Sequence, residues 1–138
     1  MSTPTIVFEK GAVQSVLEAW ITGVEQDDLG LISQVVAHDE DVMYIGSGTD
    51  ERIMGWSTLK AALEAQAAAL SDIHITASEV AIHPLGGGQA AWATSLWTFE
   101  ARMGDQALSV PLRCTWIAEK REAGWVLVHF HKSVGMAG

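Results

Sequence analysis

The chain has 138 residues, of which 49% are hydrophobic and 18% are charged. This length suits one domain with a sizeable core, and the composition excludes a disordered tail or linker. The net charge of −9 disfavours nucleic acid and anionic membranes as partners, because both bind basic surfaces. A single cysteine, Cys114, excludes an intrachain disulfide and a zinc site built on several thiolates. Without a signal-peptide pattern or a membrane-length apolar run, we expect a cytoplasmic protein with one domain over residues 1–138.

The first half of the chain is expected to be mainly helical. Within residues 5–26, helical spacing places one apolar face at Val13, Val16, Leu17, Trp20, Ile21 and Val24. Asp27 and Asp28 suit the start of a second, short helix, because carboxylates meet the unpaired N–H groups of a first turn. A short strand at residues 42–46 and a turn at 46–50 follow. A third helix is expected at residues 58–70, with Ser57 as its cap and many alanines.

The second half of the chain is expected to form four strands. Alternating and aromatic-rich runs cover residues 73–85, 90–103, 107–119 and 125–134, with glycine-containing turns between them. Pro111 indicates an edge position or a bulge. The order ααβαββββ predicts an α+β fold in which a curved antiparallel sheet wraps the helices and leaves a cone-shaped interior.

The last predicted strand carries apolar or aromatic residues on both faces. Simple alternation puts Val126, Val128, Phe130 and Lys132 on one face. The other face receives Trp125, Leu127, His129 and His131. A sheet with one face in water should show polar residues there, so both faces require a cover. We expect the helices to cover one face and a second copy of the chain to cover the face with the two histidines, which gives a homodimer.

The same strand resembles a known family. The stretch Trp125–Ser133 is similar to the closing strand of the association (hub) domain of calcium/calmodulin-dependent protein kinase II, which ends in Trp and then Val-His-Phe-His-Arg-Ser. Lys132 stands here in place of the arginine, and Arg113-Cys-Thr-Trp116 resembles the penultimate strand. The stretch Tyr44–Gly48, the Gly55-Trp56 pair and the order of elements resemble SnoaL-like proteins. Both groups belong to the nuclear transport factor 2-like superfamily.

The resemblance implies a conical fold that dimerises through its sheet, and a pocket within the cone. In the hub family, basic residues at the positions of Arg113 and Lys132 line a pocket that accepts small carboxylates. A lysine keeps the charge but loses the planar fork of arginine. An aromatic lining suits a small apolar ligand, so the expected ligand-binding residues are Tyr44, Trp56, Trp92, Arg113 and Lys132. The ligand would be a small organic acid or an apolar small molecule.

Each of these residues also has a structural interpretation. Arg113 could form an internal salt bridge with Asp39, Asp41, Glu51 or Glu100, and Lys132 could extend its amine out to solvent. His129 and His131 could bind a metal from one strand face, but packing at the dimer interface is the favoured interpretation, and no metal or cofactor is expected. Cys114 lies between apolar neighbours and is expected to be an inert buried thiol.

Three functions remain open from the sequence. The first is a freestanding homodimeric binding domain that holds a small organic acid with Arg113 and Lys132. The second is an isomerase or dehydratase in the same pocket, which requires an inward carboxylate near Tyr44, with Asp41, Asp50, Glu51 and Glu100 as candidates. The third is an oligomerisation module without a pocket. The sequence identifies no catalytic residue and leaves the question of catalysis open.

Overall fold

Helices precede a long meander of strands along the chain. The structure, a computed structural model, describes residues 8–136. Its helices are α1 (Lys10–Gln26), α2 (Leu29–Val35) and α3 (Trp56–Ala69), with a short 3-10 turn, η1 (Gly86–Gly88). Its strands are β1 (Met43–Ile45), β2 (Arg52–Met54), β3 (Ser71–Leu85), β4 (Ala90–Met103), β5 (Gln106–Arg121) and β6 (Gly124–Ser133). No helix within residues 8–136 is long and apolar enough to cross a membrane.

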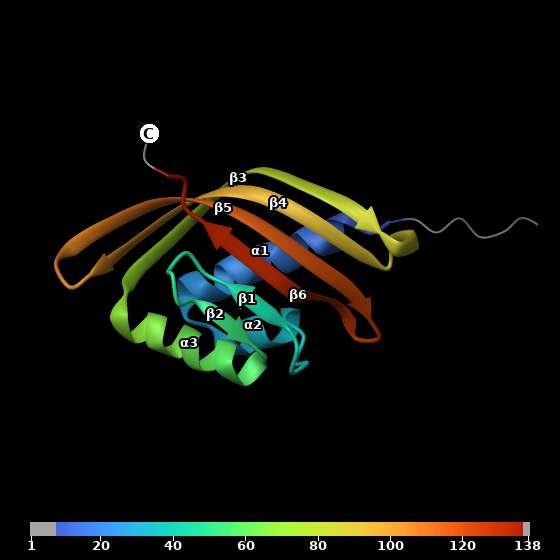
Figure 1. The fold of residues 1–138 in the computed structure, drawn as a ribbon, viewed down its shortest axis with the longest axis horizontal. Helices are drawn as coiled ribbons and strands as arrows, with labels where there is room; N and C mark the ends of the chain where they lie inside the picture. Colours follow the sequence, from blue (N-terminus) through green and yellow to red (C-terminus); the bar gives the residue numbers. More distant parts are fainter. Residues whose placement is uncertain (1–7, 137–138) are drawn as a thin grey trace, which may run out of the picture.

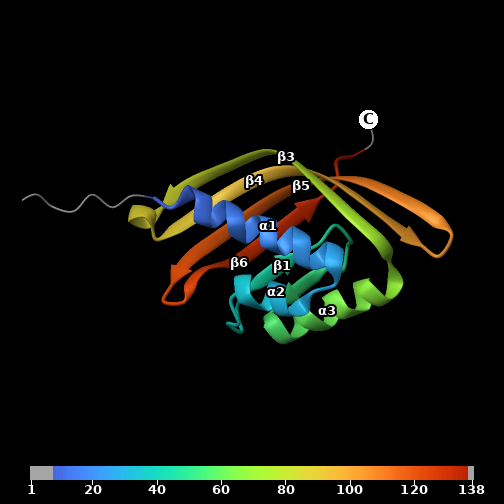
Figure 2. The same ribbon diagram turned by 180° about the vertical axis from the view of Figure 1, so that it is seen from behind.

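All six strands belong to one curved, open sheet in the order β2-β1-β6-β5-β4-β3. The long strands β3 to β6 arch over α1, and α2 and α3 lie below them, as Figures 1 and 2 show from opposite sides. Neighbouring strands are antiparallel except β1, which pairs in parallel with β6. The predicted α+β class, with its curved sheet wrapped around helices, is therefore confirmed.

The region between α2 and α3 holds two strands, where the sequence predicts one. β1 and β2 form a small hairpin, closed by a hydrogen bond from the Gly46 N–H to the Glu51 carbonyl, 2.8 Å long. The predicted turn at residues 46–50 is the tip of this hairpin. β2 has only three residues, which is too short for an alternating pattern to be recognisable, and this is why the prediction missed it.

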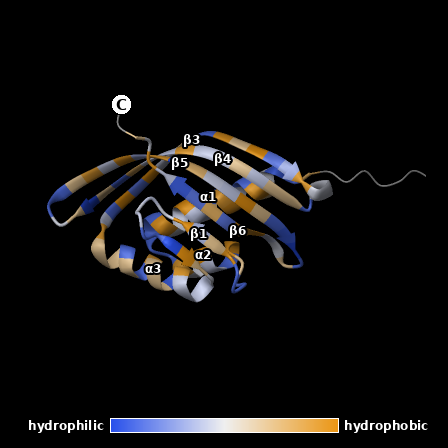
Figure 3. Cartoon of the chain, in the orientation of Figure 1, coloured by the Kyte–Doolittle hydropathy of each residue, from blue (hydrophilic) through white to orange (hydrophobic). Residues whose placement is uncertain are grey.

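The apolar face of α1 packs under the sheet as its spacing predicts. Its buried residues are Val13, Val16, Leu17, Trp20, Gly23 and Val24. The helix begins at Lys10 rather than at residue 5, and residues 5–7 lie outside the described part of the chain. Asp28 caps α2 as expected, because its carboxylate accepts the N–H of Leu31 at 3.0 Å. Along the long strands, hydrophobic and polar residues alternate (Figure 3).

The start of α3 differs from the prediction. Gly55, not Ser57, is the N-cap residue, and its φ of 86° lies in a region that favours glycine. A Cβ at this position would come within 3.2 Å of the Glu40 carbonyl oxygen. The backbone of Gly55 also donates to the Val42 carbonyl at 2.7 Å, which ties the helix start to the chain before β1. Ser57 therefore falls inside the first turn.

A β-bulge interrupts the alternation of β6. Ile117 of β5 pairs with His129, but the next residue, Ala118, pairs with Leu127. Val128 is thus an extra residue without a partner on β5. An extra residue exchanges the two faces of a strand from that point onward. The two halves of β6 therefore follow opposite alternation patterns.

The bulge corrects the predicted dimer interface. Trp125 and Leu127, expected on the outer face, are 7% and 0% exposed and belong to the core. After the bulge the inward residues are Phe130 and Lys132, which both line the cavity described below. The inner face of β6 is therefore a mixture of the two sets that simple alternation keeps apart.

Candidate functional site

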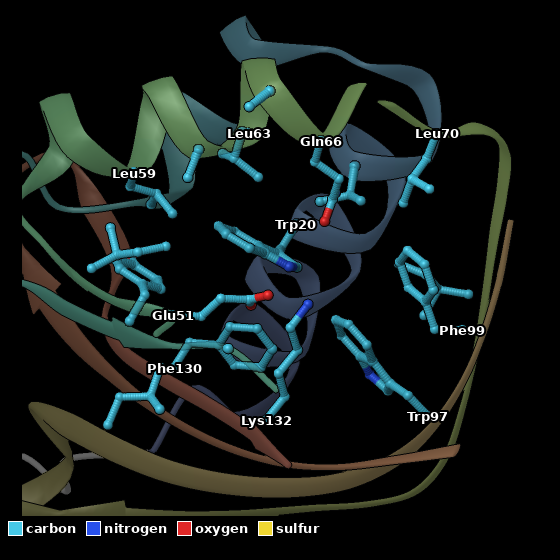
Figure 4. Close-up of a pocket in the computed structure, with 18 of the residues that line it drawn as sticks. Trp20, Glu51, Leu59, Leu63, Gln66, Leu70, Trp97, Phe99, Phe130 and Lys132 are labelled. Carbon is cyan, nitrogen blue, oxygen red and sulfur yellow. The ribbon is translucent and has the colours of Figure 1, made fainter. Parts of the chain in front are cut away.

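A cavity of about 500 Å³ lies between the open end of the sheet, α1 and α3. Most of its wall is apolar, and Figure 4 shows the side chains that surround it. Its lining residues are Trp20, Val24, Tyr44, Ile45, Gly46, Glu51, Ile53, Leu59, Ala62, Leu63, Ala65, Gln66, Ala69, Leu70, Ile75, Trp97, Phe99, Phe130 and Lys132. This volume lies within the usual ~300–1,000 Å³ of small-molecule sites. The cavity is therefore the candidate binding site.

Aromatic rings from four elements form the floor of the cavity. Trp20 of α1 lies flat on Tyr44 of β1, with ring centroids 5.7 Å apart. It also contacts Phe130 of β6 at 5.6 Å, and Phe130 contacts Trp97 of β4 at 5.5 Å. These rings are each buried and hold one another in place. They give an apolar ligand a rigid surface without ordering flexible side chains.

Lys132 is the cationic side chain of the cavity wall. It projects inward from β6, and its Nζ lies 5.6 Å from the centroid of the Phe99 ring. Burial lowers the pKa of Lys132, because the charged amine loses hydration, while the negative charge of Glu51 acts in the opposite direction. None of the ion pairs formed within residues 8–136 includes Lys132. Its amine is therefore available to a polar group of a ligand.

Glu51 is the carboxylate on the same cavity wall. It stands at the end of the β1–β2 turn, and in Figure 4 its carboxylate and the Lys132 amine point toward one another. Two glycines give this side chain its place. A Cβ at Gly48 would come within 2.7 Å of a Glu51 carboxylate oxygen, and a Cβ at Gly46 would overlap the carboxylate. The Gly46-Ser-Gly48 sequence of the turn therefore allows Glu51 to face the cavity.

Tyr44 lines the cavity, but its hydroxyl is already engaged. The hydroxyl donates to the backbone carbonyl of Leu127 at 3.4 Å, and the side chain is 2% exposed. Burial raises the pKa of Tyr44 well above its usual value, so the phenol remains protonated. The ring contributes to the wall, and the hydroxyl is directed to the backbone between β1 and β6.

Arg113, Trp92 and Trp56 do not line this cavity, which corrects the expectation that Arg113 and Lys132 share one pocket. Cys114 is the register partner of Lys132, so the neighbouring Arg113 is on the opposite face of the sheet. Its guanidinium donates to the Val134 carbonyl at 3.4 Å. Trp92 is 38% exposed on that outer face and stacks on His83, and Trp56 stacks on His38 beside α2.

The predicted interface residues also separate. Trp125 donates its Nε1–H to Glu9 at 2.8 Å and packs inside the chain with Leu127. His129 is half-buried with its Nδ1 3.0 Å from the Met43 carbonyl oxygen, and His131 is exposed on the outer face. Within residues 8–136, no group of three or more His, Cys, Asp or Glu side chains is placed to hold a metal ion.

Several cavity residues carry no signal of the site in the sequence. Trp20 belongs to the predicted apolar face of α1, and Gln66 falls within the predicted helix at residues 58–70 without any feature that marks it. Glu51 was one of four candidate carboxylates, and the other three do not line the cavity. The signal that could have selected Glu51 is the pair of glycines that precede it in the turn.

The cavity and the arched sheet define a class of protein, the nuclear transport factor 2-like fold. One similar structure is a nuclear transport factor 2-like superfamily protein from Salmonella enterica, with 22% identity, a TM-score of 0.84 and coverage of 93% of this chain and 92% of that chain. The CaMKII hub of S. rosetta has 21% identity and a TM-score of 0.78, and the match covers 94% of this chain and 99% of that chain. A hexachlorocyclohexane dehydrochlorinase from Novosphingobium barchaimii has 12% identity and a TM-score of 0.79, and the match covers 92% of this chain and 86% of that chain. These similarities establish the fold alone.

The family follows from the sequence itself. The model of the SnoaL-like domain matches residues 13–137, which is most of the chain. The chain therefore belongs to the SnoaL-like domain family. A comparison with curated proteins found no match.

Proposed function

We propose that this protein binds a small, largely apolar organic acid in the conical cavity, with the acid group at Lys132. The observation that carries the proposal is the half-buried amine of Lys132 on a wall of aromatic and aliphatic side chains, where it forms no ion pair within residues 8–136. A carboxylate ligand would supply the charge partner that a buried ammonium needs. Arg113 has no part in this proposal because it lies on the other face of the sheet.

Glu51 restricts which acids fit. Its negative charge lies on the same wall as Lys132, so a second carboxylate on the ligand would be repelled. A ligand with one acid group and an apolar body is therefore favoured over a dicarboxylate. The apolar body would be buried against Trp20, Leu63 and Phe130, where each Å² removed from water contributes about 25 cal/mol.

Calorimetric titration with 4-phenylbutanoate and with its uncharged amide tests the proposal, and the cavity tryptophans give a second readout by fluorescence. We expect the acid to bind and Lys132→Met to weaken it at least about tenfold, or about 1.4 kcal/mol. Arg113→Ala is the matched control and should leave the affinity unchanged. Equal affinity of acid and amide, or of wild type and K132M, would overturn the proposal.

A second candidate function is proton transfer on a bound ligand, with Glu51 as the base and Lys132 stabilising a developing oxyanion. The carboxylate and amine that point toward one another in Figure 4 favour this function. Lys132 takes the role of donor that the sequence suggested for Tyr44, because the Tyr44 hydroxyl is already bonded to the Leu127 carbonyl. The similar structure described as a dehydrochlorinase shows that the fold can carry an enzyme. Deuterium exchange into a ketone ligand, followed by NMR, should depend on Glu51 and be lost in Glu51→Gln. Exchange that is no faster than in buffer would remove this candidate.

The outer face of the sheet supports a homodimer. Trp92 and Leu96 are 38% and 42% exposed there, beside Thr94 and Ile117, and none of the helices in the described part of the chain lies on this face of the sheet (Figure 1). A second copy, packed face to face, would bury these residues. Sedimentation should show a dimer that Leu96→Glu dissociates, and a monomeric wild type would contradict it. The cavity argues against a role in assembly alone, because a pure oligomerisation module has no need of one.

A further inference from the structure

Lys132 combines three features that are rare for a lysine. Its side chain is largely enclosed, and its amine lies over the apolar ring of Phe99, 5.6 Å from the ring centroid. It faces an open cavity of about 500 Å³ rather than packed side chains. Among the described residues, no carboxylate forms an ion pair with it. An amine in such a place can reach a reactive carbon of a bound molecule.

The structure assigns Lys132 a nucleophilic role: its amine forms an imine with an aldehyde or ketone whose apolar body occupies the cavity. This inference rests on the proposed function to the extent that the same cavity admits the ligand. It differs in the ligand group that meets the amine, which is a carbonyl carbon rather than a carboxylate. The bond formed is covalent and reversible.

The step is balanced with the groups present. The lone pair of the Lys132 Nζ forms the C–N bond while the π pair of the carbonyl moves to oxygen, which gives a carbinolamine. Glu51 carries one proton from the nitrogen to the alkoxide oxygen, which gives the neutral carbinolamine, and then carries the second nitrogen proton to the hydroxyl, which leaves as water while the C=N bond forms. The products are one imine and one water, and the reverse sequence of steps hydrolyses the imine. No oxidant, reductant or metal takes part.

The surroundings of Lys132 favour the neutral amine that this step needs. Burial lowers the pKa of Lys132, and each unit of lowering multiplies the neutral fraction at pH 7 by about ten. Two other titratable groups face it closely. Glu51 acts against the lowering, and Cys114, the register partner on β5, stays neutral because burial raises the pKa of its thiol to about 12.

The other lysines of the chain provide an internal comparison. Lys10 and Lys60 are exposed, and Lys120 is 41% exposed and paired with Glu9 at 3.0 Å. None of them lies in a cavity that would concentrate an apolar carbonyl compound. A reaction that is faster at Lys132 than at the other lysines would therefore be an effect of the cavity.

The test uses the intact wild-type chain with 4-phenylbutanal and sodium cyanoborohydride at pH 7. The reductant delivers hydride to the imine carbon and converts the imine to a stable secondary amine, which peptide mapping by mass spectrometry locates. We expect Lys132 to be modified at least tenfold faster than Lys60, and 4-phenylbutanoate to protect it. Modification of Lys60 and Lys120 at the same rate as Lys132, or no adduct at Lys132, would overturn the inference.

Two variants test the chemistry of the step. Lys132→Arg keeps the positive charge but removes the nucleophilic amine, so the adduct at residue 132 should be lost. Glu51→Gln removes the group that carries the protons, so adduct formation at Lys132 should slow. The wild-type chain itself separates this inference from the proposed function. Acid binding without an adduct in the wild type would refute the imine and leave the proposed function standing. An adduct at Lys132 without acid binding would refute the proposed function and support the imine. Since the mapping is done on the wild type, a variant that fails to fold does not affect the main result.

Discussion

The two ends of the cone use the same strand in opposite ways. At the packed end, Trp125 and Leu127 of β6 are enclosed under α1 and α2 and fill the core. At the open end, Phe130 and Lys132 of the same strand face the cavity. The bulge at Val128 makes this change possible, because it lets both pairs point inward.

The helix that faces each end accounts for the rest of the difference. At the packed end, α1 presents branched apolar side chains such as Val13, Val16 and Leu17 to the sheet. The cavity-facing side of α3 instead includes three alanines, Ala62, Ala65 and Ala69. Small side chains leave the space between α3 and the sheet unfilled. The cavity therefore exists because α3 carries small side chains where large ones would fill the space. The closely packed end of the cone contributes the stability that the unfilled end does not.

Truncating a leucine at each end should expose this contrast most strongly. Leu127 is fully enclosed, so Leu127→Ala should lower the free energy of unfolding by about 3 kcal/mol, through lost burial and a new void. Leu63 borders the existing cavity, so Leu63→Ala should cost only about 1 kcal/mol. Urea denaturation of both variants measures the difference. Equal losses would show that the open end carries as much stability as the packed end.

Replacing the Lys132 amine should weaken ligand binding and raise the free energy of unfolding. Lys132→Met keeps the length of the side chain and removes a charge that is poorly hydrated, so we expect the free energy of unfolding to rise by about 1 kcal/mol at pH 7. Because the pKa is lowered in the folded state, the penalty is present at neutral pH and disappears above about 10.4, where the unfolded chain is also neutral. Denaturation at pH 7 and pH 11 gives the comparison. A destabilised K132M at pH 7 would mean that the cation–ring contact with Phe99 outweighs the loss of hydration.

Filling the open end should remove the site at little cost to the fold. Ala62→Phe places a ring in the cavity, and we expect a change in stability within about 1 kcal/mol together with loss of 4-phenylbutanoate binding. Ala61→Phe is the matched control, since Ala61 is exposed and does not line the cavity. Thermal unfolding and titration calorimetry measure the two effects. Retained affinity in A62F would place the ligand elsewhere.

The sequence was sufficient for the fold and for part of the site. The face of α1 follows from helical spacing, and the long strands follow from alternation and glycine turns, which are local signals. The bulge at Val128 could not be predicted, because it occurs in a Val-Leu-Val run without glycine or proline. The position of Arg113 outside the cavity depends on its register with β6. The glycines at 46 and 48 mark the turn that makes room for the Glu51 side chain, but no local pattern shows that this turn places Glu51 opposite Lys132.

The smallest expected effect concerns a surface contact that secures the packed end. Glu9 accepts the Nε1–H of Trp125 at 2.8 Å and pairs with Lys120 at 3.0 Å, and these contacts lower the pKa of Glu9, the Trp125 hydrogen bond most of all. A lowered carboxyl pKa contributes stability above the ordinary pKa of 4.5, and this contribution is lost as the pH falls through the lowered value. We therefore expect Glu9→Gln to reduce the loss of stability in urea titrations between about pH 5 and about pH 3. The change should be modest, because water screens exposed groups, and identical pH slopes in wild type and E9Q would show that the contact contributes nothing to the packed end.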